Sequence, residues 1–342
     1  MKLLKYIVSF IFVLGIILVG YLYSVIWATN VPAKLSSEYV EIPSGTTLPQ
    51  LSEQLVNEGF IKNKSSFKKV AKWMNYNDSS IKSGRYRLVP ESSNRELIQL
   101  LRSGKQTAVE LTYNNLRSLE QLAGKLTAPL MIDSSSMYNA LTNTSIQEQY
   151  GYTKDDFMSL FIPNSYQIWW NISEEDLIKK ISVEHGRFWN TKRTNKAAAI
   201  GLTTKEVYTL ASIVEKETLA LSEKNRIAGV YINRLKKGMK LQADPTVVYA
   251  VGDFTIRRVL NKHLSYDSPY NTYLYNGLPP GPICMPEISS IDAVLNYEEH
   301  NYIFFCAKPD NSGKHAFART NAQHSRNANA YRSWLNKRKV MK

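Results

Sequence analysis

Two glutamates in an apolar segment are the residues of this sequence best suited to acid–base chemistry. Residues 203–219 read TTKEVYTLASIVEKETL and contain Glu215 and Glu217. A carboxyl group in an apolar pocket has a raised pKa and can serve as a general acid. Cleavage of a glycosidic bond requires such an acid, because the departing oxygen must be protonated.

The two glutamates belong to a predicted helix. Thr203 and Glu206 have the spacing of a capping box, which predicts the start of that helix. At about 100° per residue, Glu215 lies near Ala211, whereas Glu217 lies about 200° away from Glu215. Apolar residues occupy most of the circumference, so we expect the helix to be buried on several sides. A buried carboxylate costs several kcal/mol unless it is paired or protonated.

Either glutamate can also be purely structural, paired with a basic side chain. Arg226 and Arg234 on the following helix are the expected partners, because Lys216 lies on a different face from both glutamates. The pattern alone does not choose between Glu215 and Glu217. Since they point to opposite faces, they cannot form one acid–base pair in a single cleft. Asp244, on a separate loop, is the nearby candidate for the second carboxylate that ordinary hydrolysis uses.

Other catalytic chemistries find little support in the sequence. It contains no Walker loop, no GxSxG elbow and no HExxH motif. The five histidines form no i, i+4 pair, and the two cysteines, Cys284 and Cys306, belong to no CxxC motif. We therefore expect neither a metal site nor a cofactor, and we expect the cysteines to be unpaired packing residues.

The N-terminus predicts a membrane anchor. Residues 6–27 read YIVSFIFVLGIILVGYLYSVIW, an uncharged run long enough to cross a hydrocarbon core of about 30 Å. Lys2 and Lys5 precede the run, and the positive-inside rule keeps residues 1–5 in the cytoplasm. We expect a single-pass protein of the cytoplasmic membrane with its bulk on the outer side. A cleaved signal peptide is the less favoured alternative, because its apolar core spans only about 7 to 15 residues.

The formal net charge is +14, from 43 Lys and Arg against 29 Asp and Glu. Such an excess predicts attraction to an anionic surface, such as nucleic acid, acidic lipid or an acidic polymer. The export topology argues against nucleic acid. Cell-wall polymer or lipid headgroups are the favoured partners.

The remaining patterns predict an α+β fold. Residues 28–37 form a linker, and residues 38–112 alternate short strands with three short helices in a small module. Residues 113–342 form a mainly helical domain, with helices expected at 174–188, 203–219, 222–237 and 322–337. A β-hairpin is expected from 302–307 and 315–317. Residues 128–151 show little pattern, and 163–166 read as a loop.

Four sequence blocks, taken in order, resemble a known family. They are ASIVEKET, INRLKKGMKLQADPTVVYA, YNTYLYNGLPPGPI and HAFARTNAQHSRNANAY. This set resembles the YceG-like family of endolytic transglycosylases over nearly the whole chain, and residues 38–112 are similar to a LysM-like domain. One departure is Asn164 in Pro-Asn-Ser-Tyr, where the family often has aspartate.

The resemblance implies a peptidoglycan lyase that cuts within nascent glycan strands and ends their growth. It implies that Glu215 is the catalytic acid and base. Glu215 would protonate the oxygen between N-acetylmuramic acid and N-acetylglucosamine, and then assist attack by the muramic C6 hydroxyl. The 1,6-anhydro product forms without water, so no second carboxylate is needed. Peptidoglycan synthases are the protein partners that this activity suggests.

The QADPT and NTY blocks are expected to line the sugar cleft. Their amides and hydroxyls can bond to sugar hydroxyls and acetamido groups, and each can instead stabilise its own loop. The expected binding residues are Gln242, Asp244, Thr246, Asn271, Thr272 and Tyr273. Two other functions stay open, namely a muramidase that uses water and a membrane-anchored glycan-binding scaffold of the wall-synthesis machinery.

Overall fold

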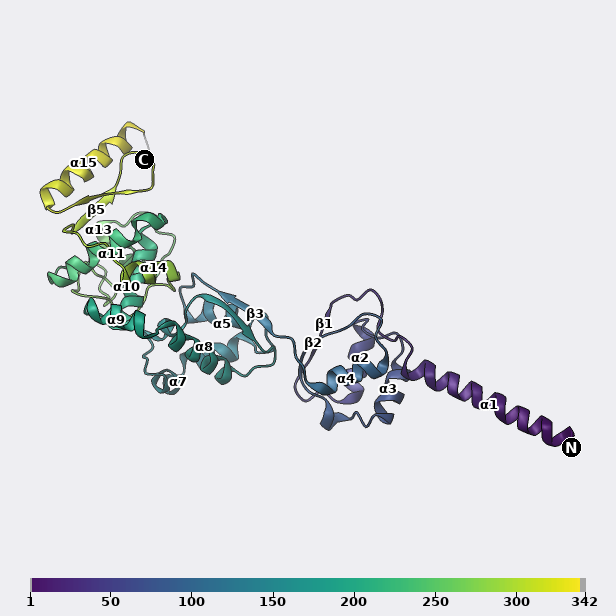
Figure 1. Ribbon diagram of the computed structural model, residues 1–342. Helices are drawn as coiled ribbons and strands as arrows, with labels where there is room; N and C mark the ends of the chain where they lie inside the picture. The colour runs from purple at the N-terminus through teal and green to yellow at the C-terminus, as the bar shows by residue number, and fades with distance from the viewer. Residues whose placement is uncertain (1, 339–342) are drawn as a thin grey trace. The chain divides into compact units, whose positions relative to one another are not determined.

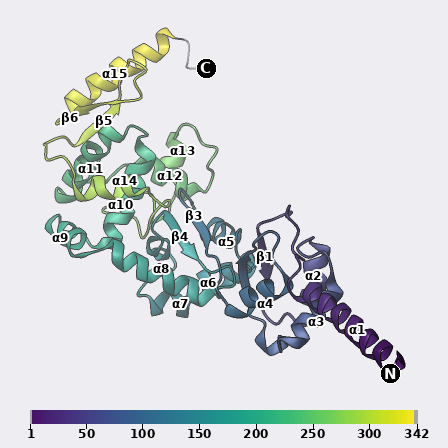
Figure 2. The ribbon, with the colours of Figure 1, turned by 45° about the vertical axis from the view of Figure 1, so that its right-hand side comes forward.

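The computed structural model describes residues 2–338 and divides into two compact units (Figures 1 and 2). Unit 1 comprises residues 1–111, 129–132 and 166–173, and unit 2 comprises 112–128, 133–165 and 174–342. Within residues 2–338 the strands form three two-stranded sheets, and most of the chain is helical. The fold is thus mixed and mainly helical.

The first helix, α1 (Lys2–Ile26), is the expected anchor. Residues 3–26 are apolar and long enough to cross a membrane, and most of their side chains are exposed in unit 1. Its last turn is different, because Val25 is buried in the hydrophobic core of unit 1. The amide of Asn94 also donates to the Val25 carbonyl at 3.0 Å. The C-terminal end of α1 is therefore packed into the core of unit 1.

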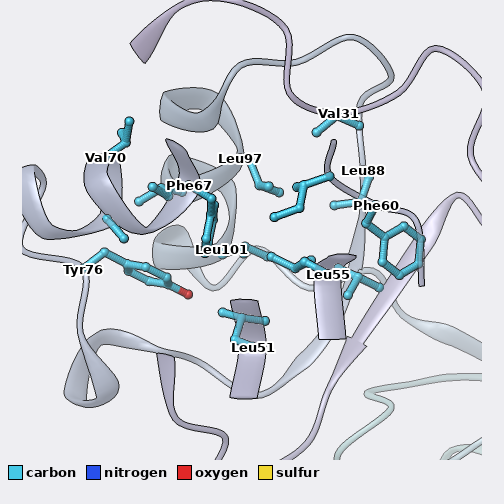
Figure 3. Packing of buried hydrophobic residues seen from close by; sticks show 14 of the residues in the cluster. Val31, Leu51, Leu55, Phe60, Phe67, Val70, Tyr76, Leu88, Leu97 and Leu101 are labelled. Atoms are coloured by element: carbon cyan, nitrogen blue, oxygen red, sulfur yellow. The ribbon is translucent and has the colours of Figure 1, made fainter. Parts of the chain in front are cut away.

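The rest of unit 1 is a small α+β arrangement. Its elements are β1 (Tyr39–Ile42), α2 (Leu48–Asn57), α3 (Lys64–Trp73), η1 (Asp78–Ser80), β2 (Gly84–Arg87) and α4 (Asn94–Ser103). Strands β1 and β2 are antiparallel, with Val40 opposite Tyr86. Leu51, Phe67 and Leu97 from the three helices meet in one core (Figure 3). The predicted α+β pattern is confirmed here, while the likeness to a LysM domain stays a prediction.

The remaining elements begin with β3 and run to the C-terminus. They are β3 (Val109–Tyr113), α5 (Leu119–Thr127), α6 (Ser134–Thr142), α7 (Thr144–Gln149), η2 (Phe157–Leu160), β4 (Asn164–Ile168), α8 (Glu174–Phe188), α9 (Thr191–Ala199), α10 (Thr204–Glu217), α11 (Leu221–Lys236), α12 (Asp244–Val251), α13 (Asn261–Leu264), α14 (Ile288–Leu295), β5 (Phe304–Ala307), β6 (His315–Ala318) and α15 (Asn321–Lys337). Helices α10, α11 and α14 pack on one another in unit 2 (Figure 1).

Two expectations for the region before α8 were wrong. The stretch 128–151 contains α6 and α7, each begun by a side-chain cap, Asp133 for α6 and Asn143 for α7. Residues 163–166 are not only a loop, because β4 begins at Asn164 and pairs with β3. In both places the local sequence is polar, and its apolar pattern is too short to show periodicity.

The C-terminal hairpin is confirmed. Strands β5 and β6 are antiparallel, with Phe305 opposite Phe317, and α15 packs against both strands (Figure 2). Cys306 lies in β5 and Cys284 is buried elsewhere in unit 2, and both thiols are free.

Candidate active site

Helix α10 holds both glutamates, and its ends are well defined. The Thr203 hydroxyl accepts from the Glu206 N–H, and the Glu206 carboxylate accepts from the Thr203 N–H at 2.7 Å, so the predicted capping box is confirmed. Every residue from Val207 to Val214 is buried. The helix ends at Glu217, because Thr218 has extended backbone angles. Glu215 and Glu217 therefore lie in the last turn of a helix whose preceding two turns are buried.

Glu215 is part of a buried ion pair. Its Oε2 accepts from Lys224 Nζ at 2.9 Å, and the two side chains are only 13% and 5% exposed. The Ser290 hydroxyl donates to the same oxygen at 2.5 Å. Lys224 lies on α11 and Ser290 on α14, so Glu215 ties three packed helices together. The same carboxylate oxygen of Glu215 is thus bonded by both a buried basic side chain and a hydroxyl.

Glu217 has different surroundings. Its Oε1 accepts from the Tyr231 hydroxyl at 2.5 Å, and no ion pair within residues 2–338 includes it. Burial among protein atoms raises the pKa of Glu217 to about 7, although part of the side chain remains exposed. The Asp244 charge raises this pKa further, while the Tyr231 hydrogen bond and Arg234 lower it. A position in the last helical turn also disfavours a negative charge.

Two cavities of unit 2 share Glu217 and Asp244 in their walls. The first cavity has a volume of about 660 Å³, and Tyr249 and Phe254 also line it. The second has a volume of about 400 Å³, and its wall includes Tyr231. Glu215 lines neither of them. The two carboxylates therefore border both cavities.

A buried arginine holds the loop that carries Gln242. The Arg234 guanidinium donates to the backbone carbonyls of Ile303 at 2.7 Å and Leu241 at 2.8 Å, and to Gln242 Oε1 at 3.3 Å. Gln242 has a φ of 50°, a strained value for a residue other than glycine. Its side chain is exposed and lines the second cavity. Arg234 thus fixes a loop beside Glu217 and does not neutralise that glutamate through an ion pair.

Asp244 and Tyr273 face the second cavity together. The Tyr273 hydroxyl donates to Asp244 Oδ1 at 2.6 Å, and both residues line the cavity. Burial and this hydrogen bond raise the pKa of Tyr273, so the hydroxyl keeps its proton. Asp244 is the first residue of α12 and not its cap, which leaves the carboxylate free for Tyr273.

The other three predicted binding residues lie in the interior. Thr246, Asn271 and Thr272 are at most 1% exposed. The Thr246 and Thr272 hydroxyls are 2.8 Å apart, and Thr272 accepts from the Ala243 N–H at 3.0 Å. The Asn271 amide donates to the carbonyls of Leu264 and Tyr266. Their contact with sugar stays a prediction, and in the structure the hydrogen bonds of these three side chains join the loops that present Gln242, Asp244 and Tyr273.

The sequence did not reveal the partners of the glutamates. Arg226 bonds to Glu298 and not to a glutamate of α10, and the partner of Glu215 is Lys224. No pattern in the sequence indicated that Tyr231 is a hydrogen-bond partner of Glu217. The wheel did place Glu215 and Glu217 on opposite faces, and the structure gives each its own set of neighbours.

Comparison with known proteins identifies the family. A family model described as the YceG-like family matches residues 40–330. The chain belongs to the YceG-like family. The matched range includes both glutamates and all residues around the two cavities except Tyr331.

Two curated relatives of this YceG-like chain share most of its length. The endolytic murein transglycosylase of Bacillus subtilis (strain 168) is 30% identical over 324 residues, which cover 87% of this chain and 86% of the relative. The protein of the same name from Streptococcus pneumoniae (serotype 2, strain D39 / NCTC 7466) is 26% identical over 328 residues, which cover 85% of this chain and 58% of the relative.

A solved structure is also similar to this YceG-like chain. The crystal structure of the putative yceG-like protein lmo1499 from Listeria monocytogenes superposes with a TM-score of 0.55 and is 28% identical. The match covers 85% of this chain and 99% of the Listeria chain. Sequence and fold therefore agree on the family.

Proposed function

We propose that this chain is an endolytic murein transglycosylase whose general acid is Glu217. The observation that carries the proposal is a carboxyl that lines two cavities and has a pKa raised to about 7. Relatives in Bacillus subtilis and Streptococcus pneumoniae bear the name endolytic murein transglycosylase. An enzyme that cuts inside a polymer needs room for sugars on both sides of the bond, and the two cavities that Glu217 borders would supply it.

The choice of Glu217 departs from the expectation for Glu215. Glu215 is paired with the buried Lys224 and bonded by Ser290, and it lines neither of the two cavities. Glu217 is bonded by a neutral hydroxyl and opens into both cavities. A general acid must hold its proton near the working pH and reach the leaving oxygen. Glu217 meets both requirements better.

The reaction would proceed in two proton transfers. Protonated Glu217 gives its proton to the glycosidic oxygen as the bond from the muramic C1 to that oxygen breaks. The Glu217 carboxylate then takes the proton of the muramic C6 hydroxyl as O6 bonds to C1. No water is consumed, and the strand ends in a 1,6-anhydro ring. The nucleophile belongs to the substrate, which gives it a high effective concentration.

Asp244 supports a second candidate, hydrolysis of the same bond. Its carboxylate is near enough to Glu217 to raise the pKa of that residue, and it lines both cavities. Glycosidases that use water employ a second carboxylate to activate the water or to stabilise the sugar cation. Gln242 and Tyr273 would orient the sugar in either reaction.

Mass spectrometry of the products separates the two candidates. The full chain in detergent is incubated with purified glycan strands, and the new ends are weighed. The proposed reaction predicts anhydro ends throughout, each lighter by one water than a hydrolysed end. Reducing muramic ends would show that the protein is a muramidase. Strands that stay intact would support the glycan-binding scaffold function instead.

The anchor suggests where the reaction takes place. Helix α1 is the first element of unit 1, and Lys2 and Lys5 favour a cytoplasmic N-terminus. Both units would then face the wall outside the cytoplasmic membrane, where peptidoglycan is the substrate and peptidoglycan synthases are candidate partners. A protease added to intact spheroplasts should therefore digest both units. Full protection of the protein would indicate the opposite orientation.

A further inference from the structure

The wall of the first cavity contains both acidic and basic side chains. Glu217 and Asp244 are the acidic ones. The basic ones come from three separate segments, the one before α5, the end of α10 and the loop between α12 and α13. We call these cations the basic rim, and its members are Arg117, Lys216, Arg257 and Arg258.

Neutral partners hold two members of the basic rim in place. Lys216 Nζ donates to Asn115 Oδ1 at 2.7 Å, and Asn115 has a φ of 49°, in the left-handed region. The Arg117 guanidinium lies over the Phe254 ring, 4.6 Å from its centroid. Neither contact cancels a charge. Within residues 2–338, no carboxylate lies within ion-pair distance of Arg117, Lys216 or Arg257.

The sugars of a stem-bearing glycan strand offer these cations no negative charge to pair with. N-acetylglucosamine is uncharged, and the lactyl carboxyl of a muramic residue becomes a neutral amide when a peptide is attached. The attached peptide has free carboxylates of its own. Arginine pairs with carboxylates through two parallel hydrogen bonds, which suits a rim beside the scissile sugar.

We propose that the basic rim is a subsite for the carboxylates of the peptide stem on the muramic residue at the cut. The proposal rests on the proposed function and specifies its substrate as peptide-bearing strands. Stem binding would draw the muramic residue into the first cavity and hold its glycosidic oxygen near Glu217. Binding energy gained away from the reacting atoms is used in this way to orient them.

The test compares two substrates and measures one ratio. Strands with intact stems, and strands whose stems an amidase has removed so that only the lactyl carboxylate remains on each muramic residue, are each given to the full chain in detergent. The value of kcat/KM is measured for both. We expect the wild type to favour peptide-bearing strands by about 10- to 100-fold, the range of one or two charge-assisted hydrogen bonds. In an Arg117→Gln/Arg257→Gln variant the ratio should fall to about 1.

Two controls make the result specific. A Lys179→Gln/Lys192→Gln variant removes the same charge from exposed positions that do not line the first cavity, and it should keep the wild-type ratio. Strands freed of phosphodiester polymers by hydrofluoric acid should also keep it. If that treatment removes the preference, phosphate and not the stem binds the rim, and the proposal is overturned.

The remaining outcomes separate this proposal from the proposed function. Equal cleavage of both strands by the wild type would overturn the stem subsite and leave the transglycosylase intact. A preference that survives in the Arg117→Gln/Arg257→Gln variant would also overturn the subsite. Cleavage of neither strand would overturn the function and the subsite together.

Discussion

Glu215 and Glu217 lie two residues apart on α10, yet their surroundings have little in common. Glu215 faces Lys224, a cation that is itself buried, and the pair joins packed helices. Glu217 faces the neutral Tyr231 hydroxyl and opens into two cavities. Burial without a paired cation raises the pKa of Glu217 to about 7, whereas the buried Lys224 joins Glu215 to the neighbouring helix. The difference lies in the partner and not in the degree of burial alone.

Breaking the Lys224–Glu215 pair should have the largest effect on stability. Lys224→Met leaves the Glu215 carboxylate without its cation, which should lower the free energy of unfolding by about 3 to 5 kcal/mol. Urea denaturation of the full chain in detergent would measure this change in the free energy of unfolding. Lys236→Met on the same helix is the control, because Lys236 is exposed and its loss should change stability by less than about 0.5 kcal/mol. If Lys224→Met and Lys236→Met are equally stable, the structural role given to Glu215 is contradicted.

Tyr231→Phe should act on the pKa of Glu217 and so on the pH profile. The Tyr231 hydrogen bond lowers that pKa, so its loss should raise it, by roughly one unit if the bond is worth about 1.4 kcal/mol to the charged form. The acid must be protonated to work, and the wild-type rate should fall as the pH rises through about 7. In the variant this fall should move to higher pH.

The matched control for Tyr231→Phe is Tyr86→Phe, which removes a buried hydroxyl from unit 1. Its pH profile should equal that of the wild type.

The stability of the protein should also depend on pH through Glu217, because the pKa of this residue is higher in the folded protein than in the unfolded chain. The free energy of unfolding should decline between pH 4.5 and about 7, and Glu217→Gln should remove that part of the decline. A profile that does not move in Tyr231→Phe would contradict the role given to Glu217.

Asp244→Asn should have the smallest effect, and in the opposite direction. The Asp244 charge raises the pKa of Glu217, so its removal should shift the alkaline limb of the profile to lower pH by less than about one unit. The asparagine oxygen can still accept from Tyr273. If the variant instead loses nearly all activity, Asp244 takes a direct part, as the hydrolytic candidate requires.

Local signals in the sequence predicted the elements that hold the site. Thr203 and Glu206 marked the start of α10, and the apolar wheel indicated that the helix is buried and that its glutamates point apart. The hairpin and the anchor also followed from their patterns. Each of these features depends on residues close together in the chain, where capping and periodicity act.

The choice between the glutamates depends on distant residues, and the sequence did not supply it. Ser290 comes from α14 and Tyr231 from the far half of α11, and only packing brings them to α10. Family resemblance pointed to Glu215 and to six cleft residues. The structure places Gln242, Asp244 and Tyr273 at the cavities. It buries Thr246, Asn271 and Thr272 beneath them, because a hydroxyl or amide that joins loops looks the same in a sequence as one that binds sugar.

The most direct test is the rate at which anhydro ends form in Glu217→Gln and Glu215→Gln, measured side by side on the same strands. Glu217→Gln should stay as stable as the wild type at neutral pH and lose about a thousandfold in rate, the typical contribution of a general acid. Glu215→Gln should be less stable, because Lys224 loses its counter-charge, but should keep more than about a tenth of the rate at temperatures where it is folded. The reverse result, an active Glu217→Gln and a folded but inactive Glu215→Gln, would contradict the account.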